Sequence, residues 1–203
     1  MKNLYLFLIT LLTLPALISC QQDDVDNIGY LRIEVGTNAY VDTRIAADYN
    51  PKQIALQILD SKGGIVESTD DWETLSGQQI RLEAGTYTVK ASSNGFDGSE
   101  SGFDIPYYAG SQQITVQTGK EVTANITCTL ANVKVTVNYD QSFIDAFQSA
   151  TATVKSAMEG VNELSFRMGD ELKPAYFPVA DLTATISVTN HSGQQFSQDT
   201  PIT

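Results

Sequence analysis

Carboxylates are plentiful among the side chains in this sequence that could do chemistry, with 24 Asp and Glu in 203 residues. The segment Asp70-Asp71-Trp72-Glu73 places three of them beside the only tryptophan. A carboxylate pair can hydrolyse a glycosidic bond, but only when a cleft holds the two groups several ångströms apart. Nothing in the spacing here indicates such a pair. A hydrolase that uses Asp71, Glu73 and Asp97 is therefore a minor hypothesis.

A single histidine restricts the remaining enzyme chemistry. His191 lies in Asn190-His191-Ser192-Gly193, a pattern that indicates a strand end entering a turn. A Ser-His-Asp triad or a multi-histidine metal site cannot be built around one histidine unless other residues take over. The sequence also has no nucleophile-elbow, Walker or dinucleotide-binding motif. We therefore predict a protein that is not an enzyme and that needs no cofactor.

The loop from Asn94 to Asp104 combines glycines with carboxylates. Asp97, Glu100 and Asp104 could bind Ca²⁺, which takes several oxygen ligands on a flexible frame. Their spacing does not match an EF-hand loop. The alternative is a solvated, glycine-rich loop without a metal.

Aromatic side chains around this loop could stack on a sugar. Tyr107 and Tyr108 follow the loop directly, and Trp72 lies in the acidic segment described above. These three residues are the candidate glycan contacts. The alternative is that the tyrosines seal one end of a β-sandwich and that Trp72 folds back onto it.

The N-terminal segment predicts a processed, lipid-anchored protein. Lys2 precedes an apolar run, Leu4 to Ile18, that is too short to span a bilayer comfortably. The run ends in Ser19-Cys20, a small residue before a cysteine, as in a lipobox. In that pattern the chain is cut between these two residues and Cys20 is acylated. We expect residues 1–19 to be a signal peptide and Cys20 to hold the protein in outer-membrane lipid.

An acidic segment follows the cysteine, and we expect residues 20–27 to form a tether. Within it, Gln21, Gln22, Asp23 and Asp24 resemble the surface-export signal of Bacteroidetes lipoproteins. The alternative is a solvated tether without a targeting role, since like charges repel and stay extended. The first interpretation predicts an outer-membrane protein that faces the cell surface.

Charge and cysteine usage narrow the class of partner. The formal net charge is −12, which argues against nucleic acid because binding there needs Lys and Arg to replace counterions. If Cys20 is lipidated, Cys128 has no partner for an intrachain disulfide. Cys128 alternates with Ile126 and Leu130, so we interpret it as a small buried hydrophobe.

Period-two alternation of apolar and polar residues runs through the chain and predicts an all-β fold of two tandem antiparallel β-sandwiches of transthyretin or immunoglobulin type. One brief helix is expected, with Ser142 as its cap and with Phe143 and Phe147 on one face. The predicted strands are Leu31–Val35, Gln53–Ile58, Ile80–Glu83, Thr86–Ala91, Gln112–Gln117, Val122–Leu130, Val133–Tyr139, Thr151–Ser156, Glu163–Met168 and Asp181–Thr189.

A change of phase marks a boundary between the sandwiches. In the strand that ends at Leu130 the alternating apolar residues Ile126, Cys128 and Leu130 are even-numbered, whereas Val133, Val135, Val137 and Tyr139 of the next strand are odd-numbered. A slip of one residue turns every side chain to the other face, so the chain must bulge or change sheets at Ala131-Asn132. We therefore place a first sandwich at residues 28–131 and a second at 132–203. The second resembles a repeat of the first that runs out after Thr189, which would leave a sheet edge and part of a core open.

Four segments resemble a family of Bacteroidetes lipoproteins that carry a domain of unknown function: Gly29-Tyr30-Leu31, Leu82 to Val89, Phe103 to Ser111 and Cys128 to Val137. That family is similar in layout to the fimbrillin-like lipoproteins, which are tandem transthyretin-like sandwiches. The resemblance implies the same fold and location, and it implies no established activity.

The fimbrillin resemblance also implies a processing site. In fimbrillins a protease cuts after an arginine near the N-terminus, and loss of the first strand opens a groove that a neighbour's strand fills. This is β-strand addition, in which main-chain hydrogen bonds supply the affinity. The residue that fits best is Arg44, with Arg32 second, and the alternative is an ordinary loop arginine with a solvated head.

Two functions remain open. The first is a surface-anchored, non-enzymatic structural or adhesive module, such as a pilus subunit or pilus accessory protein that binds a protein partner by β-strand addition. The second is a glycan-binding surface lipoprotein that supports polysaccharide capture.

Overall fold

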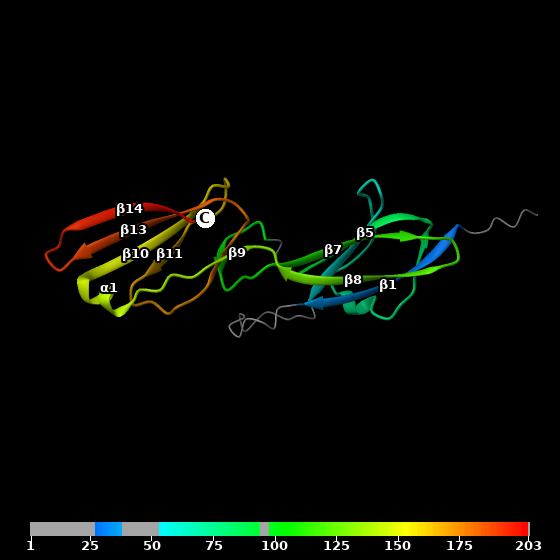
Figure 1. Ribbon diagram of the computed structural model, residues 1–203, viewed down its shortest axis with the longest axis horizontal. Coiled ribbons are helices and arrows are strands. Elements are labelled where there is room, and N and C mark those ends of the chain that lie inside the picture. The colour runs from blue at the N-terminus through cyan, green and yellow to red at the C-terminus, as the bar shows by residue number, and fades with distance from the viewer. Residues whose placement is uncertain (1–26, 38–52, 94–97, 203) are drawn as a thin grey trace, which may run out of the picture.

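The computed structural model describes residues 27–37, 53–93 and 98–202, and in these residues the all-β prediction is confirmed. Within these ranges the helical elements are one short α-helix and one 3-10 helix. Figure 1 shows an elongated molecule in which two β-rich units follow one another along the long axis. None of the helices in this part of the chain is long and apolar enough to span a membrane.

The first unit contains one seven-stranded sheet in the order β3-β2-β5-β7-β8-β1-β4. Its elements are β1 (Ile28–Thr37), β2 (Ile54–Leu59), β3 (Ile65–Thr69), the 3-10 helix η2 (Trp72–Thr74), β4 (Ile80–Glu83), β5 (Gly85–Ser93), β7 (Tyr108–Val116) and β8 (Glu121–Leu130).

This sheet folds over on itself to make two layers. β7 and β8 are paired only at Tyr108–Leu130 and Ala109–Thr129, so they separate along the rest of their length. One layer is then β3-β2-β5-β7 and the other is β8-β1-β4. Against the antiparallel expectation, β1 and β8 are parallel over eight residue pairs.

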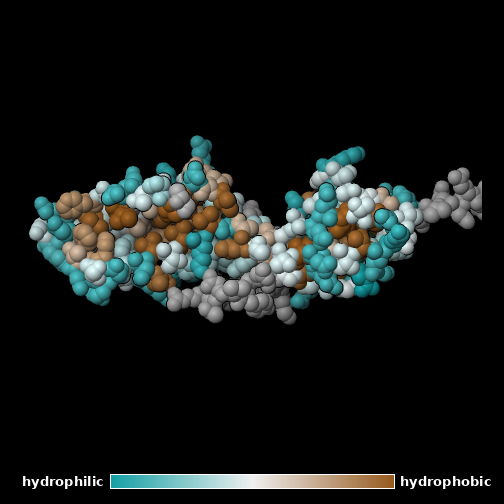
Figure 2. Space-filling view, in the orientation of Figure 1, coloured by the Kyte–Doolittle hydropathy of each residue, from teal (hydrophilic) through white to brown (hydrophobic). Residues whose placement is uncertain are grey.

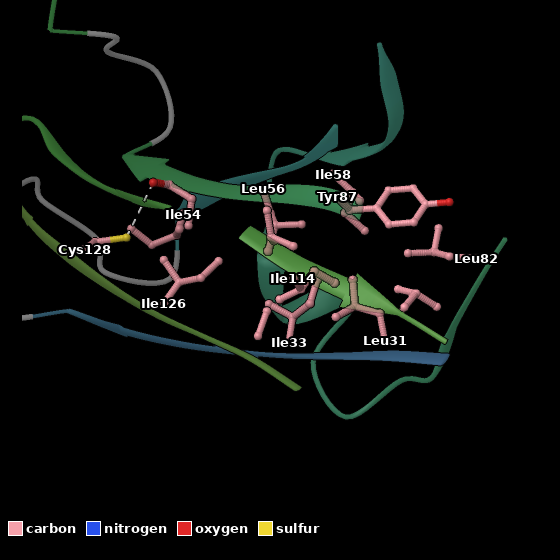
Figure 3. Close-up of a cluster of buried hydrophobic side chains, with 14 of the residues drawn as sticks. Leu31, Ile33, Ile54, Leu56, Ile58, Leu82, Tyr87, Ile114, Ile126 and Cys128 are labelled. Carbon is pink, nitrogen blue, oxygen red and sulfur yellow. Dashed lines mark hydrogen bonds between the residues drawn. The ribbon is translucent and has the colours of Figure 1, made fainter. Parts of the chain in front are cut away.

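The core of the first unit lies between these layers (Figure 3). The inward positions are those that the alternation predicts, including Leu31 and Ile33 of β1 and Leu56 of β2. Cys128 is fully buried among them, and its Sγ lies 3.6 Å from the carbonyl oxygen of Ala91. Burial raises the pKa of the Cys128 thiol to about 11. The prediction that this cysteine is a buried hydrophobe is therefore confirmed.

The second unit has two sheets, with strand orders β11-β10-β13-β14 and β6-β12-β9. Its elements are β6 (Gly102–Phe103), β9 (Val133–Val135), α1 (Gln141–Ala146), β10 (Phe147–Ser156), β11 (Leu164–Arg167), β12 (Ala175–Phe177), β13 (Leu182–Asn190) and β14 (Gln195–Ile202). A second hydrophobic core lies between them and includes Val154, Phe166 and Phe177. The expectation that strands end at Thr189 is wrong, because β14 follows and pairs with β13 over eight residues.

One strand of the second unit comes from the chain of the first. β6 lies between β5 and β7 in sequence, yet it pairs with β12, with Phe103 opposite Ala175. The ring of Phe103 meets that of Phe166 edge to face, with centroids 5.3 Å apart. The main-chain nitrogen of Asp104 donates to the carbonyl oxygen of Pro174 at 3.0 Å. The two units therefore share strands, and the division into domains at Ala131-Asn132 stays a prediction.

The predicted junction is a buried turn between β8 and β9. Asn132 is only 6% exposed, and its amide bridges two main-chain groups of the first unit. Its Oδ1 accepts from the nitrogen of Tyr107, and its Nδ2 donates to the carbonyl of Ile105, both at 3.2 Å. The nitrogen of Ala131 donates to the carbonyl of Tyr107 at 2.7 Å. The chain thus passes between the units through a hydrogen-bonded clip.

The short helix forms where the sequence predicts it, but with a different cap. Asp140, and not Ser142, is the N-cap: its carboxylate accepts from the nitrogen of Phe143 at 2.8 Å and from the hydroxyl of Ser142 at 2.7 Å. These two hydrogen bonds, that of Ser142 first, lower the pKa of Asp140. The expectation that Phe143 and Phe147 share a helix face is wrong, because Phe147 has extended backbone and begins β10. The two rings still pack together, with centroids 4.7 Å apart.

Candidate binding surfaces

Several predicted site residues lie outside the described residues. They are the lipidation and cleavage residues Ser19 and Cys20, the export segment Gln21 to Asp24, the processing candidate Arg44 and the calcium candidate Asp97. Their roles stay predictions.

The other two calcium candidates flank β6. Glu100 is exposed, and Asp104 has a positive φ of 59° that turns the chain after β6. Its main chain is held by Pro174 of the second unit, as described above. Within the described ranges, no group of three or more His, Cys, Asp and Glu side chains gathers to hold a metal.

The acidic segment with the tryptophan is a capped turn on the first unit. A carboxylate oxygen of Asp71 accepts from the nitrogen of Glu73 at 3.0 Å and so caps the 3-10 helix. Trp72 is half-buried and packs against the first core. Asp71 therefore orders the local backbone, and Trp72 anchors the turn to the sandwich.

His191 lies in the exposed turn between β13 and β14. Its Nε2 is 3.1 Å from the carbonyl oxygen of Asp145 in α1. Asn190 organises the turn, because its Oδ1 accepts from the nitrogens of Ser192 and Gln194. This position fits the interpretation of His191 as a turn residue.

The two neighbouring tyrosines lie on opposite faces of the β3-β2-β5-β7 layer. Tyr108 is 6% exposed and belongs to the core, and its nitrogen donates to the buried hydroxyl of Ser93 at 2.8 Å. Tyr107 is half-buried on the outer face of the β3-β2-β5-β7 layer. Tyr107 borders an open cavity on this face.

That cavity, which we call the outer-face hollow, has a volume of about 650 Å³. The strand register explains its shape. Ala55 of β2 is opposite Ser92 of β5, and Ser92 is opposite Ala109 of β7, so three small side chains form one row across the sheet. The next row contains the longer Gln57 and Lys90. The small row is therefore the floor, and its flanks are the longer row and the ring of Tyr107.

A second surface, which we call the open face, lies on the inner side of β13 and β14. Ile186 and Val188 of β13 share this side, and Val188 is opposite Phe196 of β14, which is 56% exposed. The partner sheet is short, and its β6 edge contacts β11 through Phe103. Its other edge is β9, which pairs with β12 and with no other strand in the described part of the chain.

A small apolar cavity opens at the open face. Its volume is about 190 Å³, and Phe143 of α1 and Ile186 of β13 line it together with Val137, Tyr139 and Ala152. The phenol of Tyr139 crosses toward β11 and donates to the carbonyl of Phe166 at 2.9 Å. Burial raises the pKa of Tyr139. The second core is thus only partly closed at this end.

A third surface, the side groove, lies on the other side of Tyr139. Its volume is about 460 Å³, and three exposed hydrophobic residues line it: Phe103, Ile144 and Leu172. Figure 2 shows a band of hydrophobic residues along the second unit, while the visible face of the first unit is more polar. On the face that Figure 2 shows, the hydrophobic residues therefore gather mainly on the second unit.

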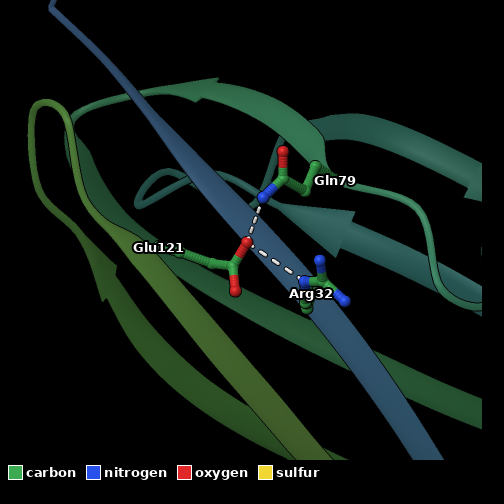
Figure 4. Close-up of polar contacts among 3 residues, drawn as sticks. All are labelled: Arg32, Gln79 and Glu121. Carbon is green, nitrogen blue, oxygen red and sulfur yellow. Dashed lines mark hydrogen bonds and ion pairs between the residues drawn. The ribbon is translucent and has the colours of Figure 1, made fainter.

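A polar cluster holds β1 in the first unit (Figure 4). The Nε of Arg32 lies 3.0 Å from Oε2 of Glu121, and the side-chain amide of Gln79 donates to the same oxygen. Hydrogen bonds from Gln79 and Arg32 lower the pKa of Glu121. Because β1 lies between β8 and β4, a protease could reach the backbone at Arg32 only after β1 had separated from its neighbours.

Three solved structures with similar strand arrangements come from Bacteroidetes. A candidate adhesin from Bacteroides ovatus has a TM-score of 0.47 and 10% identity, over 84% of this chain and 76% of that chain. A candidate polysaccharide-binding protein (DUF1812) from Bacteroides thetaiotaomicron has a TM-score of 0.46 and 11% identity, over 82% of this chain and 78% of that chain. The fimbrial anchor protein Mfa2 from Porphyromonas gingivalis has a TM-score of 0.39 and 12% identity, over 84% of this chain and 82% of that chain. Because these TM-scores are below 0.5, we infer nothing about function from them.

One protein-family model matches nearly all of the described chain. The chain matches no curated protein by sequence. A family model described as "Domain of unknown function (DUF4493)" matches residues 27–203, which include both units and the strand that they share. The resemblance to a family with a domain of unknown function is thereby confirmed, and the chain belongs to the DUF4493 family.

Proposed function

We propose that the protein is a lipid-anchored, non-enzymatic module on the cell surface that serves adhesion or assembly, in its specific form as a pilus subunit or accessory protein. The observation that carries this proposal is the open face, where Val188 and the exposed Phe196 lie beside a small apolar cavity in a partly closed core. Exposed apolar side chains beside an open pocket are what a partner's strand covers in β-strand addition.

In this proposal a strand from a protein partner covers the open face. An apolar side chain of that strand fills the cavity between Phe143 and Ile186. Burial of Phe196 and Val188 adds hydrophobic free energy of about 25 cal/mol for each Å² of apolar area removed from water. Polar Gln198 and Thr200 on the same side of β14 favour a partner strand with mixed polarity.

The anchor and the processing site are part of the same proposal. Acylation of Cys20 holds the N-terminus in outer-membrane lipid, and the acidic tether presents the first unit to the outside. Cleavage at Arg44 detaches β1 from the chain that follows it. Leu31 and Ile33 of β1 lie in the first core, so loss of this strand, which takes the anchor at Cys20 with it, opens the core to a strand from a neighbour.

The test is the state of the protein in cell envelopes. Extracts are run on a denaturing gel with and without boiling, and the protein is detected by blotting. We expect a ladder that collapses only on boiling, because strands buried between subunits resist detergent. Phe196→Ser should shorten the ladder, while Ile65→Ser, which replaces a similarly exposed residue in β3 of the first unit, should not. A single monomer band in every unboiled lane would reject the assembly form of the proposal.

A glycan-binding lipoprotein is the second candidate. The observation that favours it is the outer-face hollow, in which Tyr107 and polar side chains surround a floor of small residues. An array of glycans, probed in calcium and in chelator, tests this candidate independently of the gel.

A further inference from the structure

The geometry of the outer-face hollow points to a binding site for a neutral oligosaccharide, an inference that rests on the glycan-binding candidate above. The volume of about 650 Å³ is within the range of small-ligand sites. The floor of Ala55, Ser92 and Ala109 lets a ring approach the sheet closely. The hollow is therefore a feature of strand register, held by three neighbouring strands.

The side chains around this floor match the chemistry of a sugar. A pyranose has an apolar face of C–H groups and a rim of hydroxyls. Tyr107 supplies an aromatic wall for the apolar face. The amide of Gln57 and the hydroxyl of Ser92 each offer a donor and an acceptor for the rim. One aromatic wall with a few convergent polar groups is the pattern of an orienting site.

A peptide strand fits this hollow less well. The hollow lies on the face of β2 and β5, and each of these strands is paired on both edges. Their main-chain groups are therefore used within the sheet and cannot extend it. Recognition must come from side chains alone, which excludes strand addition at this place.

The charges in the hollow indicate a neutral ligand. Its lining contains one cation, Lys90, and one carboxylate, Asp70. These offset each other, so the lining has no net charge that would select an ionic ligand. The whole chain carries a net charge of −12, which repels an anionic polysaccharide at long range.

The test uses detergent-solubilised full chain on an array of neutral and anionic oligosaccharides, followed by titration of the best ligand. Tyr107→Ala removes the aromatic wall, and Ser92→Trp fills the floor without removing a core contact. We expect each to weaken binding about tenfold or more, as loss of a central contact does. Gln113→Ala is the matched control, because Gln113 is exposed on β7 and lies outside the hollow. Thermal unfolding confirms that each variant is folded.

The possible outcomes distinguish a protein that binds no glycan from one that binds glycan at another place. If no glycan binds the wild type, the glycan-binding candidate fails and this site fails with it. If the wild type binds and both hollow variants bind equally well, glycan binding stands and the hollow is rejected as its site. Binding confined to anionic glycans and lost in salt would overturn the neutral class. Binding of neutral glycans that is lost in both variants and kept in Gln113→Ala supports the inference.

Discussion

Two glycines of β1 have very different surroundings. A Cβ added at Gly29 would overlap the carbonyl oxygen of Gln117 and lie 2.6 Å from Cγ1 of Val116. A Cβ added at Gly36 meets nothing within 4 Å. We expect Gly29→Ala to destabilise the protein by about 1–3 kcal/mol, because the β7–β8 turn must move. Gly36→Ala should be neutral or slightly stabilising, since it only restricts the unfolded chain. Urea unfolding measures both, and equal stabilities would contradict the close approach at Gly29.

The titration of Glu121 predicts a pH dependence of stability. Its pKa is lowered in the folded state by Gln79 and Arg32, from an ordinary value of 4.5. A carboxylate of this kind stabilises the fold above its unfolded pKa and loses that contribution as the pH falls through its folded pKa. Glu121→Gln does not titrate, so below about pH 4.5 its urea midpoint should fall less steeply than that of the wild type. Parallel curves for the two proteins would contradict a role for this cluster.

Alternation in the sequence predicts which residues share a face, and it predicts which face is buried only where one set of alternate residues is clearly more apolar than the other. It correctly makes Cys128 a core residue, because Ile126 beside it is strongly apolar. It also places Tyr107 and Tyr108 on opposite faces. Both are tyrosines, so only the packing of β7 against β5 and β8 decides that Tyr108 is buried and that Tyr107 borders the hollow.

At the scale of elements, β6 is expected to support the second unit. Phe103→Ala removes the ring that packs on Phe166, so we expect a loss of about 1–2 kcal/mol and faster hydrogen exchange in β11 and β12. Exchange in β2 and β5 should be unchanged. Ile65→Ala, an exposed position on β3, is the control and should alter neither region. Faster exchange in β2 instead of β12 would show that the pairing of β6 has no structural role.

Four strands were not predicted from the sequence, namely β3, β6, β12 and β14, and for the last three the reason is identifiable. All three residues of β12 are buried, so it has no alternation. β14 is almost entirely exposed and polar, as an edge strand can be, and its pattern resembles that of a loop. β6 has two residues and exists through its pairing with β12. The outer-face hollow could not be predicted from the sequence either, because it depends on the register of Ala55, Ser92 and Ala109 across three strands.

At the scale of the whole molecule, the clip at Asn132 is expected to make the two units unfold together. Asn132→Ala leaves the buried nitrogen of Tyr107 and the carbonyl of Ile105 without these partners. The cost of such groups is about 1–3 kcal/mol. We expect one calorimetric transition in the wild type and two in the variant, because loss of these hydrogen bonds weakens the coupling between the units, which the pairing of β6 with β12 then carries. Two transitions in the wild type would contradict the coupling.

The parallel pairing of β1 and β8 has a mechanical consequence. Both strands point toward the second unit, so the start of β1 and the end of β8 lie at opposite ends of the first unit (Figure 1). Tension between the N-terminus and the second unit therefore pulls the two strands past each other along their length. All eight residue pairs then resist at once, whereas a hairpin pulled at its open end separates one pair at a time. A molecule tethered at its N-terminus and gripped at its far end would hold as a shear clamp.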